Sequence, residues 1–194
     1  MRNLHVVDNP NGVLTYLQAG KINSGLSFVE GQNIHSARFL MRDDALVQTV
    51  ELKAQTDGSD TLNGPMSAQV VATATNSAYS GPPRPYVVIA EHTANQAEAQ
   101  MRANAEMARL LLTAYEVEVT VQGWLTPSGS TYFPYIGQLA TLNSPLIDPR
   151  GPQLLAIKGV KSTQNSETGT STAVTLCLPI TLGGSSLVNY AVPS

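Results

Sequence analysis

The chain has 194 residues, of which only 13% are charged, and its formal net charge at pH 7 is −3. A chain of this length can bury a substantial core and form one large or two small domains. The acidic balance disfavours the basic surface that nucleic-acid-binding proteins usually carry. The many Ala, Thr, Ser, Asn and Gln residues favour surfaces that are covered by other subunits.

The sequence gives no sign of secretion or of a membrane span. Polar and turn-forming residues interrupt the first 18 positions, so the apolar centre of a signal peptide is missing. No run of 18 apolar residues occurs either, and we expect a soluble chain made in the cytoplasm. The single cysteine, Cys177, has no disulfide partner within the chain and is expected to be a small packed side chain of a strand.

The first third of the chain reads as β-rich. Apolar runs predict strands at residues 13–17, 37–41 and 46–54, and Asp43-Asp44 between the last two predicts a hairpin turn. A strand over 46–54 would place the following side chains on one face: Leu46, Val50, Leu52 and Ala54.

A second, lighter strand is expected before the middle of the chain. Residues 55–65 form a polar loop, and small side chains alternate from Ala68 to Ala74. The segment from Ser77 to Pro85 is the best linker candidate, which places a domain boundary near Ser80.

The middle of the chain predicts a strand followed by the one long helix. An apolar run at 84–90 follows a Gly-Pro-Pro breaker, which predicts a buried strand. Thr93 is expected to cap the helix, with Gln96 completing a capping box, and nothing breaks the helix before Tyr115. The expected helix therefore spans 93–115. Its apolar stripe is expected to comprise Ala97, Met101, Ala105, Ala108 and Leu112.

The rest of the chain reads as strands and turns. The period changes to two at Tyr115, which predicts a strand over 115–122 with one wet face. Residues 126–129 are turn-forming, and 161–169 is polar and turn-like. Further strands are expected at 139–142, 154–160 and 170–178. The expected fold is therefore α+β and mainly β, a small antiparallel barrel or sandwich with the helix packed against it.

Four short motifs follow one another along the chain. They are Arg84-Pro85 before an apolar strand, Gly123-Trp124 at a strand end, the aromatic-proline segment from Tyr132 to Tyr135, and Gly169-Thr170 before the last strand. Upstream, residues 25–34 contain Glu-Gly-Gln-Asn-Ile. In this order, over roughly residues 12–179, the motifs resemble the distal part of baseplate hub proteins of Mu-like contractile phage tails.

The resemblance implies a function in the virion. Such hubs are homotrimers around a central channel, and they join the hexameric tail tube to the trimeric central spike. It implies a β-rich hub region over 1–80, a tail-tube-like barrel with its helix over 81–182, and a C-terminal tail over 183–194. The chain is about half the usual hub length, so a second hub chain or a missing N-terminal part is expected to supply the remaining barrels. Expected partners are further copies of the chain, tail tube protein and central spike protein, with no membrane and no specific nucleic acid. The expected location is the tail baseplate, assembled in the host cytoplasm.

The search for chemistry is negative. His5, His35 and His92 lack the spacing of a zinc site. Asp43-Asp44 and the segment from Asp57 to Asp60 read as solvated turns rather than metal loops. No nucleophile elbow, phosphate-binding loop or dinucleotide fingerprint occurs.

Two residue pairs are candidates for catalytic groups, one an acid-base pair and the other a pair of carboxylates. Glu91 and His92 are neighbours at a strand end and helix start, so their side chains are expected to point in different directions. Glu116 and Glu118 share one strand face about 7 Å apart, which is typical of a solubilising or interface face. We therefore expect no catalytic residue, no cofactor and no metal.

Aromatic residues are the candidates for interaction. Trp124 is expected to pack against Tyr132 or Phe133 and so anchor the barrel. An alternative function is a carbohydrate-binding or adhesin-like β module, with Tyr132, Phe133 and Tyr135 exposed on one flat face. A third hypothesis, a tail-associated hydrolase, would depend on Glu91 or His92.

Overall fold

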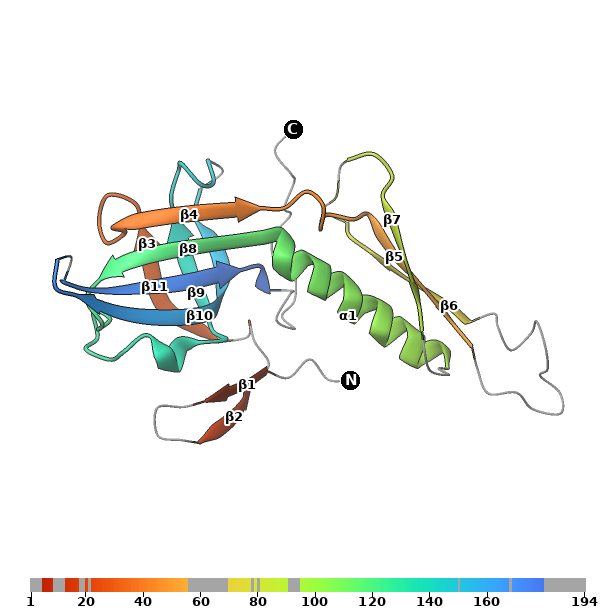
Figure 1. Cartoon of the computed structure of the whole chain (residues 1–194), viewed down its shortest axis with the longest axis horizontal. Helices are drawn as coiled ribbons and strands as arrows, with labels where there is room; N and C mark the ends of the chain where they lie inside the picture. Colours follow the sequence, from red (N-terminus) through yellow and green to blue (C-terminus); the bar gives the residue numbers. More distant parts are fainter. Residues whose placement is uncertain are drawn as a thin grey trace. The chain divides into compact units, whose positions relative to one another are not determined.

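The computed structural model describes residues 5–8, 13–17, 20, 22–55, 70–77, 79, 81–90, 95–149, 151–167 and 169–179. Among these residues the fold is α+β and mainly β, which confirms the expected class (Figure 1). A curled half-barrel sheet, a smaller sheet, a short hairpin and one α-helix make up the described structure.

One helix, one 3-10 turn and the strands follow one another along the described chain. Their bounds are β1 His5–Asp8, β2 Leu14–Leu17, β3 Asn23–Val29, β4 Ser36–Met41, β5 Thr49–Ala54, β6 Val70–Thr75, β7 Pro85–Ile89, α1 Gln96–Ala114, β8 Tyr115–Gln122, the 3-10 turn Phe133–Tyr135, β9 Leu139–Asn143, β10 Gln153–Asn165 and β11 Gly169–Cys177.

Two compact units divide the described residues. The helix unit is Asp43–Leu111, and the half-barrel unit combines the described residues of Arg2–Arg42 with those of Leu112–Leu187. This division differs from the expected boundary near Ser80 and from the expected ranges 1–80 and 81–182. The reason is strand pairing: β3 and β4 join the sheet of β8 to β11, while β7 pairs with β5. The expected tail, 183–194, lies outside the described residues.

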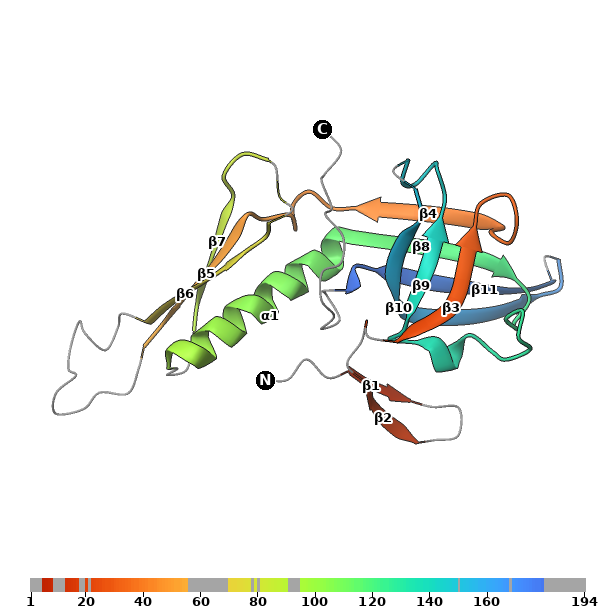
Figure 2. The same cartoon turned by 180° about the vertical axis from the view of Figure 1, so that it is seen from behind.

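The half-barrel unit is one curled sheet in the order β3-β9-β10-β11-β8-β4 (Figure 2). Its strands are antiparallel except that β3 runs parallel to β9. The predicted alternation of β8 is confirmed, because its odd-numbered residues are buried and the even ones are not. The largest fully buried side chains of this unit are Phe28, Leu142, Leu155, Ile157, Leu176, Val117, Val119 and Val174. Cys177 is buried beside Leu139 and Ala156, as a packed side chain should be.

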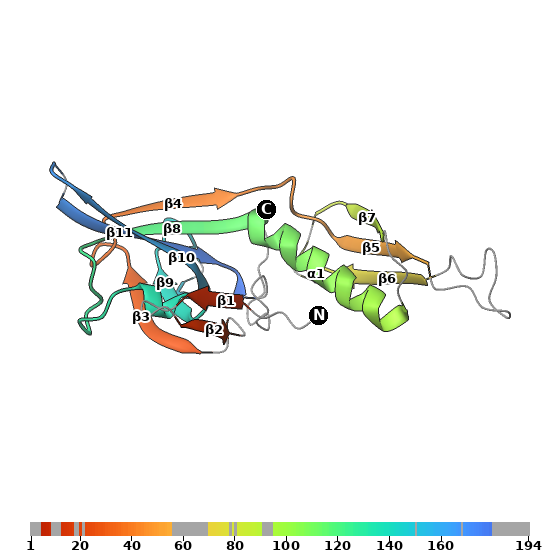
Figure 3. The same ribbon diagram turned by 60° about the horizontal axis from the view of Figure 1, so that its bottom comes forward.

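The helix unit is the three-stranded sheet β6-β5-β7 with α1 beside it (Figure 3). Val50 and Leu52 of the central strand are fully buried, and the predicted face of β5 is confirmed. The side-chain amides of Gln96 and Gln100 donate to the carbonyls of Val71 and Thr73, each at 2.9 Å. The helix thereby covers the free edge of β6, which would otherwise expose unpaired backbone groups. The helix belongs to this unit except for its last turn, which belongs to the half-barrel unit.

The helix starts later than expected, and with a different cap. Asn95 Oδ1 accepts from the backbone N–H of Glu98 at 3.0 Å, and the Glu98 carboxylate accepts from the N–H of Asn95 at 3.1 Å. This reciprocal pair is a capping box. Thr93, the expected cap, lies outside the described residues.

The apolar stripe of α1 is also different from the prediction. Met101 is 45% exposed, and the buried positions are Ala99, Ala103, Met107, Leu111 and Ala114. Because alanine occurs on several faces of this helix, two apolar stripes have the same spacing. The stripe that holds Met107 and Leu111 is the buried one.

Two local turn predictions are corrected by long-range pairing. Asp43 does start a turn, since its carbonyl accepts from the N–H of Leu46 at 3.1 Å, but no hairpin follows. β4 pairs with β8, and β5 pairs with β6 and β7. The polar segment after Val160 continues as strand to Asn165, because β11 offers it a partner down to Gly169. Strand β3 was not predicted, since Ser24, Gly25 and Ser27 weaken its alternation.

Candidate assembly surface and pocket

Strand β4 is an edge of the half-barrel sheet. Its register with β8 pairs Ala37 with Val119, Phe39 with Val117, and Met41 with Tyr115, and the N–H of Arg42 donates to the carbonyl of Ala114 at 2.9 Å. In an antiparallel ladder the backbone groups of alternate residues face the partner. With Arg42 facing β8, the N–H and C=O groups of residues 37, 39 and 41 point away from it. Among the described strands, β4 has no neighbour on that side.

The side chains of this edge are apolar on the core side. Phe39 is 38% exposed and Met41 is 36% exposed, although their partners Val117 and Tyr115 are buried. Proline and inward-pointing charges often protect an edge strand from pairing with another chain. Strand β4 contains neither. We call Ala37, Phe39 and Met41, with their outward backbone groups, the β4 edge. It leaves both hydrogen-bonding groups and apolar surface uncovered.

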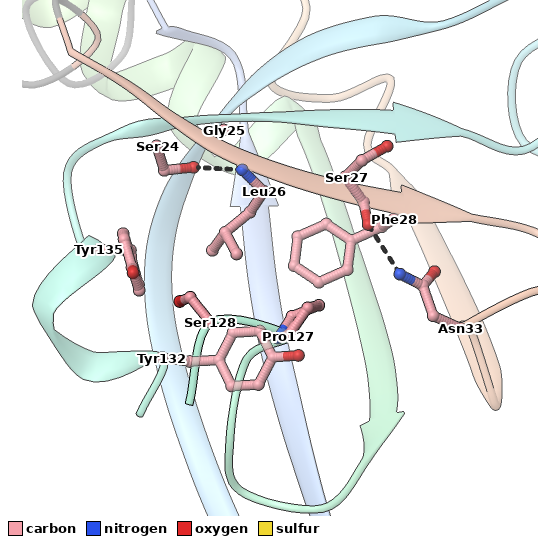
Figure 4. A pocket seen from close by; sticks show the side chains of 10 residues that line it. All are labelled: Ser24, Gly25, Leu26, Ser27, Phe28, Asn33, Pro127, Ser128, Tyr132 and Tyr135. Carbon is pink, nitrogen blue, oxygen red and sulfur yellow. Dashed lines mark hydrogen bonds between the residues drawn. The ribbon is translucent and has the colours of Figure 1, made fainter. Parts of the chain in front are cut away.

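A cavity of about 280 Å³ opens beside β3 (Figure 4). Residues 24–28 form one wall, and Asn33 closes one end by donating to the carbonyl of Ser27 at 2.7 Å. Pro127, Ser128 and Tyr132 come from the segment after β8 and form the opposite wall. The Tyr132 ring stacks on Phe28 with centroids 6.3 Å apart. We call this space the β3 cavity.

Hydroxyl groups gather at the mouth of the β3 cavity. Tyr135 Oη lies 3.2 Å from Ser130 Oγ, which lies 3.1 Å from Ser128 Oγ. These serine hydroxyls lower the pKa of Tyr135, because hydrogen bonds to its oxygen stabilise the phenolate. Burial raises the pKa of Tyr132, because the charged phenolate would lose hydration.

The structure brings two of the three predicted interaction residues together. Tyr132 and Tyr135 line the β3 cavity, whereas Phe133 does not and is 36% exposed. Tyr132 is only 6% exposed, so the three aromatics do not form a flat exposed face. The β3 wall was missed from the sequence, since no pattern links residues 24–28 to residues 127–135.

Trp124 has a different role from the one expected. Its indole N–H donates to the carbonyl of Thr163 on β10 at 3.1 Å, and the side chain remains 41% exposed. Within the described contacts, its anchoring group is this hydrogen bond rather than Tyr132 or Phe133, because Tyr132 stacks on Phe28 instead.

Two of the predicted structural motifs meet. The N–H of Gly123 donates to the carbonyl of Thr170 at 2.9 Å, and Gly123 and Gly169 adopt positive φ angles of 82° and 76° that favour glycine. The Arg84-Pro85 motif lies in the helix unit. Arg84 donates to the carbonyl of Leu46 at 3.2 Å and to the Asp43 carboxylate at 3.2 Å, and Pro85 begins the edge strand β7. These contacts give the motif residues a structural role.

The residues weighed for chemistry that the structure describes are not grouped into a reaction centre. Glu116 forms an ion pair with Lys158 at 2.5 Å, Glu118 is exposed, and so is His35. The side chains of Glu91, His92, His5, Asp57 and Asp60 lie outside the described residues. In the part of the chain that the structure describes, no three His, Cys, Asp or Glu side chains are grouped to hold a metal ion. No described helix is both long and apolar enough to span a membrane.

Comparisons with known proteins identify the fold. No protein-family model and no curated protein matches the sequence. The 43 kDa tail protein of prophage MuSo2 from Shewanella oneidensis superposes with a TM-score of 0.77 and 21% identity, over 93% of this chain and 52% of that one. The fold is that of a prophage tail protein.

Two further structures share the fold. A tail protein from Neisseria meningitidis MC58 gives a TM-score of 0.68 at 18% identity, over 94% of this chain and 53% of that one. A chain of the virion of a native gene transfer agent gives 0.51 at 12% identity, over 96% of this chain and 39% of that one. This chain spans about half the length of the two tail proteins.

Proposed function

We propose that this chain is a structural subunit of the baseplate hub of a phage or phage-like tail. It would join the tail tube to the central spike around a central channel, as a part of the virion with no catalytic role. The shared fold with two prophage tail proteins supports a structural role in a tail. The single observation that carries the proposal is the β4 edge, which a protein that works alone would protect.

The proposed mechanism is assembly through strand pairing. The outward N–H and C=O groups of residues 37, 39 and 41 can accept a strand from a neighbouring subunit, and Phe39 and Met41 would be covered in the same step. A head-to-tail contact of this kind closes a ring when its rotation is right. A homotrimer would then present threefold symmetry to the spike. A second hub chain, or further polypeptide, would complete the match to the hexameric tube, because this chain spans only half of the tail proteins that it resembles.

Amide hydrogen exchange tests the proposal at single residues. The amides of Ala37, Phe39 and Met41 should exchange rapidly in the isolated subunit. They should be protected once tail tube or spike protein is added and the assembly forms. The amide of Arg42, already bonded to Ala114, serves as an internal control and should be protected in both states. Equal, rapid exchange of the three amides in the assembled state would refute pairing at β4.

The carbohydrate-binding module is less well supported as the main function. It requires Tyr132, Phe133 and Tyr135 to form one flat platform, and Tyr132 is instead buried against Phe28. The β3 cavity, which Tyr132 and Phe28 line, lies within the half-barrel unit.

A further inference from the structure

The β3 cavity has an unusual combination of groups for so small a space. Leu26, Phe28 and Pro127 provide apolar surface, while Ser128 and Tyr132 provide hydroxyls (Figure 4). None of the lining residues is an acid, a histidine, a lysine or an arginine. A charged ligand would therefore lose hydration without gaining an ion-pair partner, which is costly.

Tyr132 supplies the observation that points to a ligand. Tyr132 is only 6% exposed, and its hydroxyl has no hydrogen bond to any described residue. A hydroxyl without a protein partner is free to donate to, and accept from, a group that occupies the space it faces. The hydroxyl is not sealed from solvent, and the residue lines the cavity. A ligand in the cavity can therefore reach this group.

An entirely apolar occupant fits the cavity poorly. A leucine or proline side chain from a partner would displace water from the Tyr132 and Ser128 hydroxyls and return no hydrogen bond to them. Hydroxyl groups both donate and accept, and they rotate to suit a partner. The matching ligand is neutral, carries several hydroxyls and has one apolar face.

We propose that the β3 cavity binds one neutral sugar ring. The C–H face of the ring packs on the Phe28–Tyr132 pair, and its hydroxyls bond to Tyr132 and Ser128. The volume of about 280 Å³ is at the small end of ligand pockets, roughly 300–1,000 Å³. It therefore suits a single ring rather than an oligosaccharide. The end unit of a cell-surface polysaccharide and a free monosaccharide share this chemistry.

Saturation-transfer NMR on the full chain tests the proposal. The probes are glucose, galactose, mannose and N-acetylglucosamine, each free and as the end unit of a polysaccharide, with sialic acid as the charged comparison. At least one neutral sugar should bind with a dissociation constant on the order of 1 mM, and sialic acid should not bind. Transfer from both forms indicates that the free sugar suffices. Transfer from the polysaccharide alone indicates a surface glycan as the source.

Matched tyrosine variants locate the site. Tyr132→Phe keeps the ring stacked on Phe28 and removes only the hydroxyl, so it should weaken binding by roughly 3- to 10-fold. Tyr79→Phe removes a hydroxyl that donates to Pro82 in the helix unit and should leave binding unchanged. No transfer to any neutral sugar would overturn the proposal, as would equal binding by Tyr132→Phe. If Tyr132→Phe changes the mass of the assembly while no sugar binds, the cavity holds a protein group and the proposal is wrong.

Discussion

The ring of Phe39 on β4 packs edge-to-face on the ring of Tyr115 on β8, with centroids 5.1 Å apart and planes at 63°. Tyr115 is buried, whereas Phe39 is 38% exposed. The pair is therefore the last layer of the half-barrel core on this side of the sheet, and its outer half is uncovered. A subunit built for assembly would use this surface, because covering it buries apolar area and satisfies the edge backbone.

Replacing Phe39 by lysine should block assembly while the subunit still folds. A lysine on an edge strand opposes pairing with another strand, while loss of the aromatic pair costs about 1 kcal/mol. Light scattering should show a shift toward the monomer, and urea unfolding should show a fold that remains cooperative. Leu146→Lys, at a site that is 86% exposed in the same unit, is the matched control and should assemble normally. Equal assembly by both variants would exclude the β4 edge.

Replacing Asn95 by alanine should destabilise the helix unit. The change removes the acceptor for the Glu98 N–H and half of the capping box, at a cost of about 1 kcal/mol. Asn95→Asp should restore most of the loss, because a carboxylate also accepts this bond and favours a helix N-terminus. Asn104→Ala, in the middle of the same helix, should be neutral or slightly stabilising. The free energy of unfolding from urea titration measures all three. No loss in Asn95→Ala would mean that Thr93 or another group caps the helix.

The sequence could predict elements whose periodicity is strong, and β8 shows why. Val117, Val119 and Val121 alternate with polar residues, so the strand and its buried face were both correct. Alternation also gave β5 its face. The helix was predicted, but not its buried stripe, because alanines on several faces made Met101 and Met107 equally good anchors.

Long-range pairing could not be predicted from local pattern. Asp43-Asp44 looks like a hairpin turn, yet β4 pairs with β8, which lies more than 70 residues later in the chain. The same holds for the β3 cavity, where Phe28 meets Tyr132 across about 100 residues. The aromatic candidates Tyr132 and Tyr135 were visible in the sequence, but the wall that turns them into a cavity was not.

Replacing Leu142 by alanine should strongly destabilise the half-barrel unit. Leu142 is 1% exposed on β9, and removing a buried leucine side chain costs about 2–5 kcal/mol through lost burial and the cavity left behind. Leu125→Ala, at a position that is 58% exposed, should change the free energy of unfolding by no more than about 0.5 kcal/mol. Equally small effects at both sites would contradict the core that the structure places inside the sheet.

Of the two cavity tyrosines, Tyr135 should ionise below the ordinary tyrosine pKa of 10.0 and Tyr132 above it. The lowered pKa of Tyr135 makes it ionise first, and its contribution to stability is present above the unfolded pKa and lost as pH falls through the folded one. The raised pKa of Tyr132 has the opposite sign, so stability falls as pH rises from the unfolded pKa through the folded one. Ultraviolet titration should show that Tyr135→Phe removes an early step and Tyr132→Phe a late one. The reverse assignment would contradict the environments described for these side chains.

The mass of the full chain in solution, measured by light scattering alone and with tail tube or spike protein added, tests the hub proposal most directly. The account predicts a trimer that captures the spike, and it predicts that Phe39→Lys loses this capture. A monomer that ignores both proteins would contradict it.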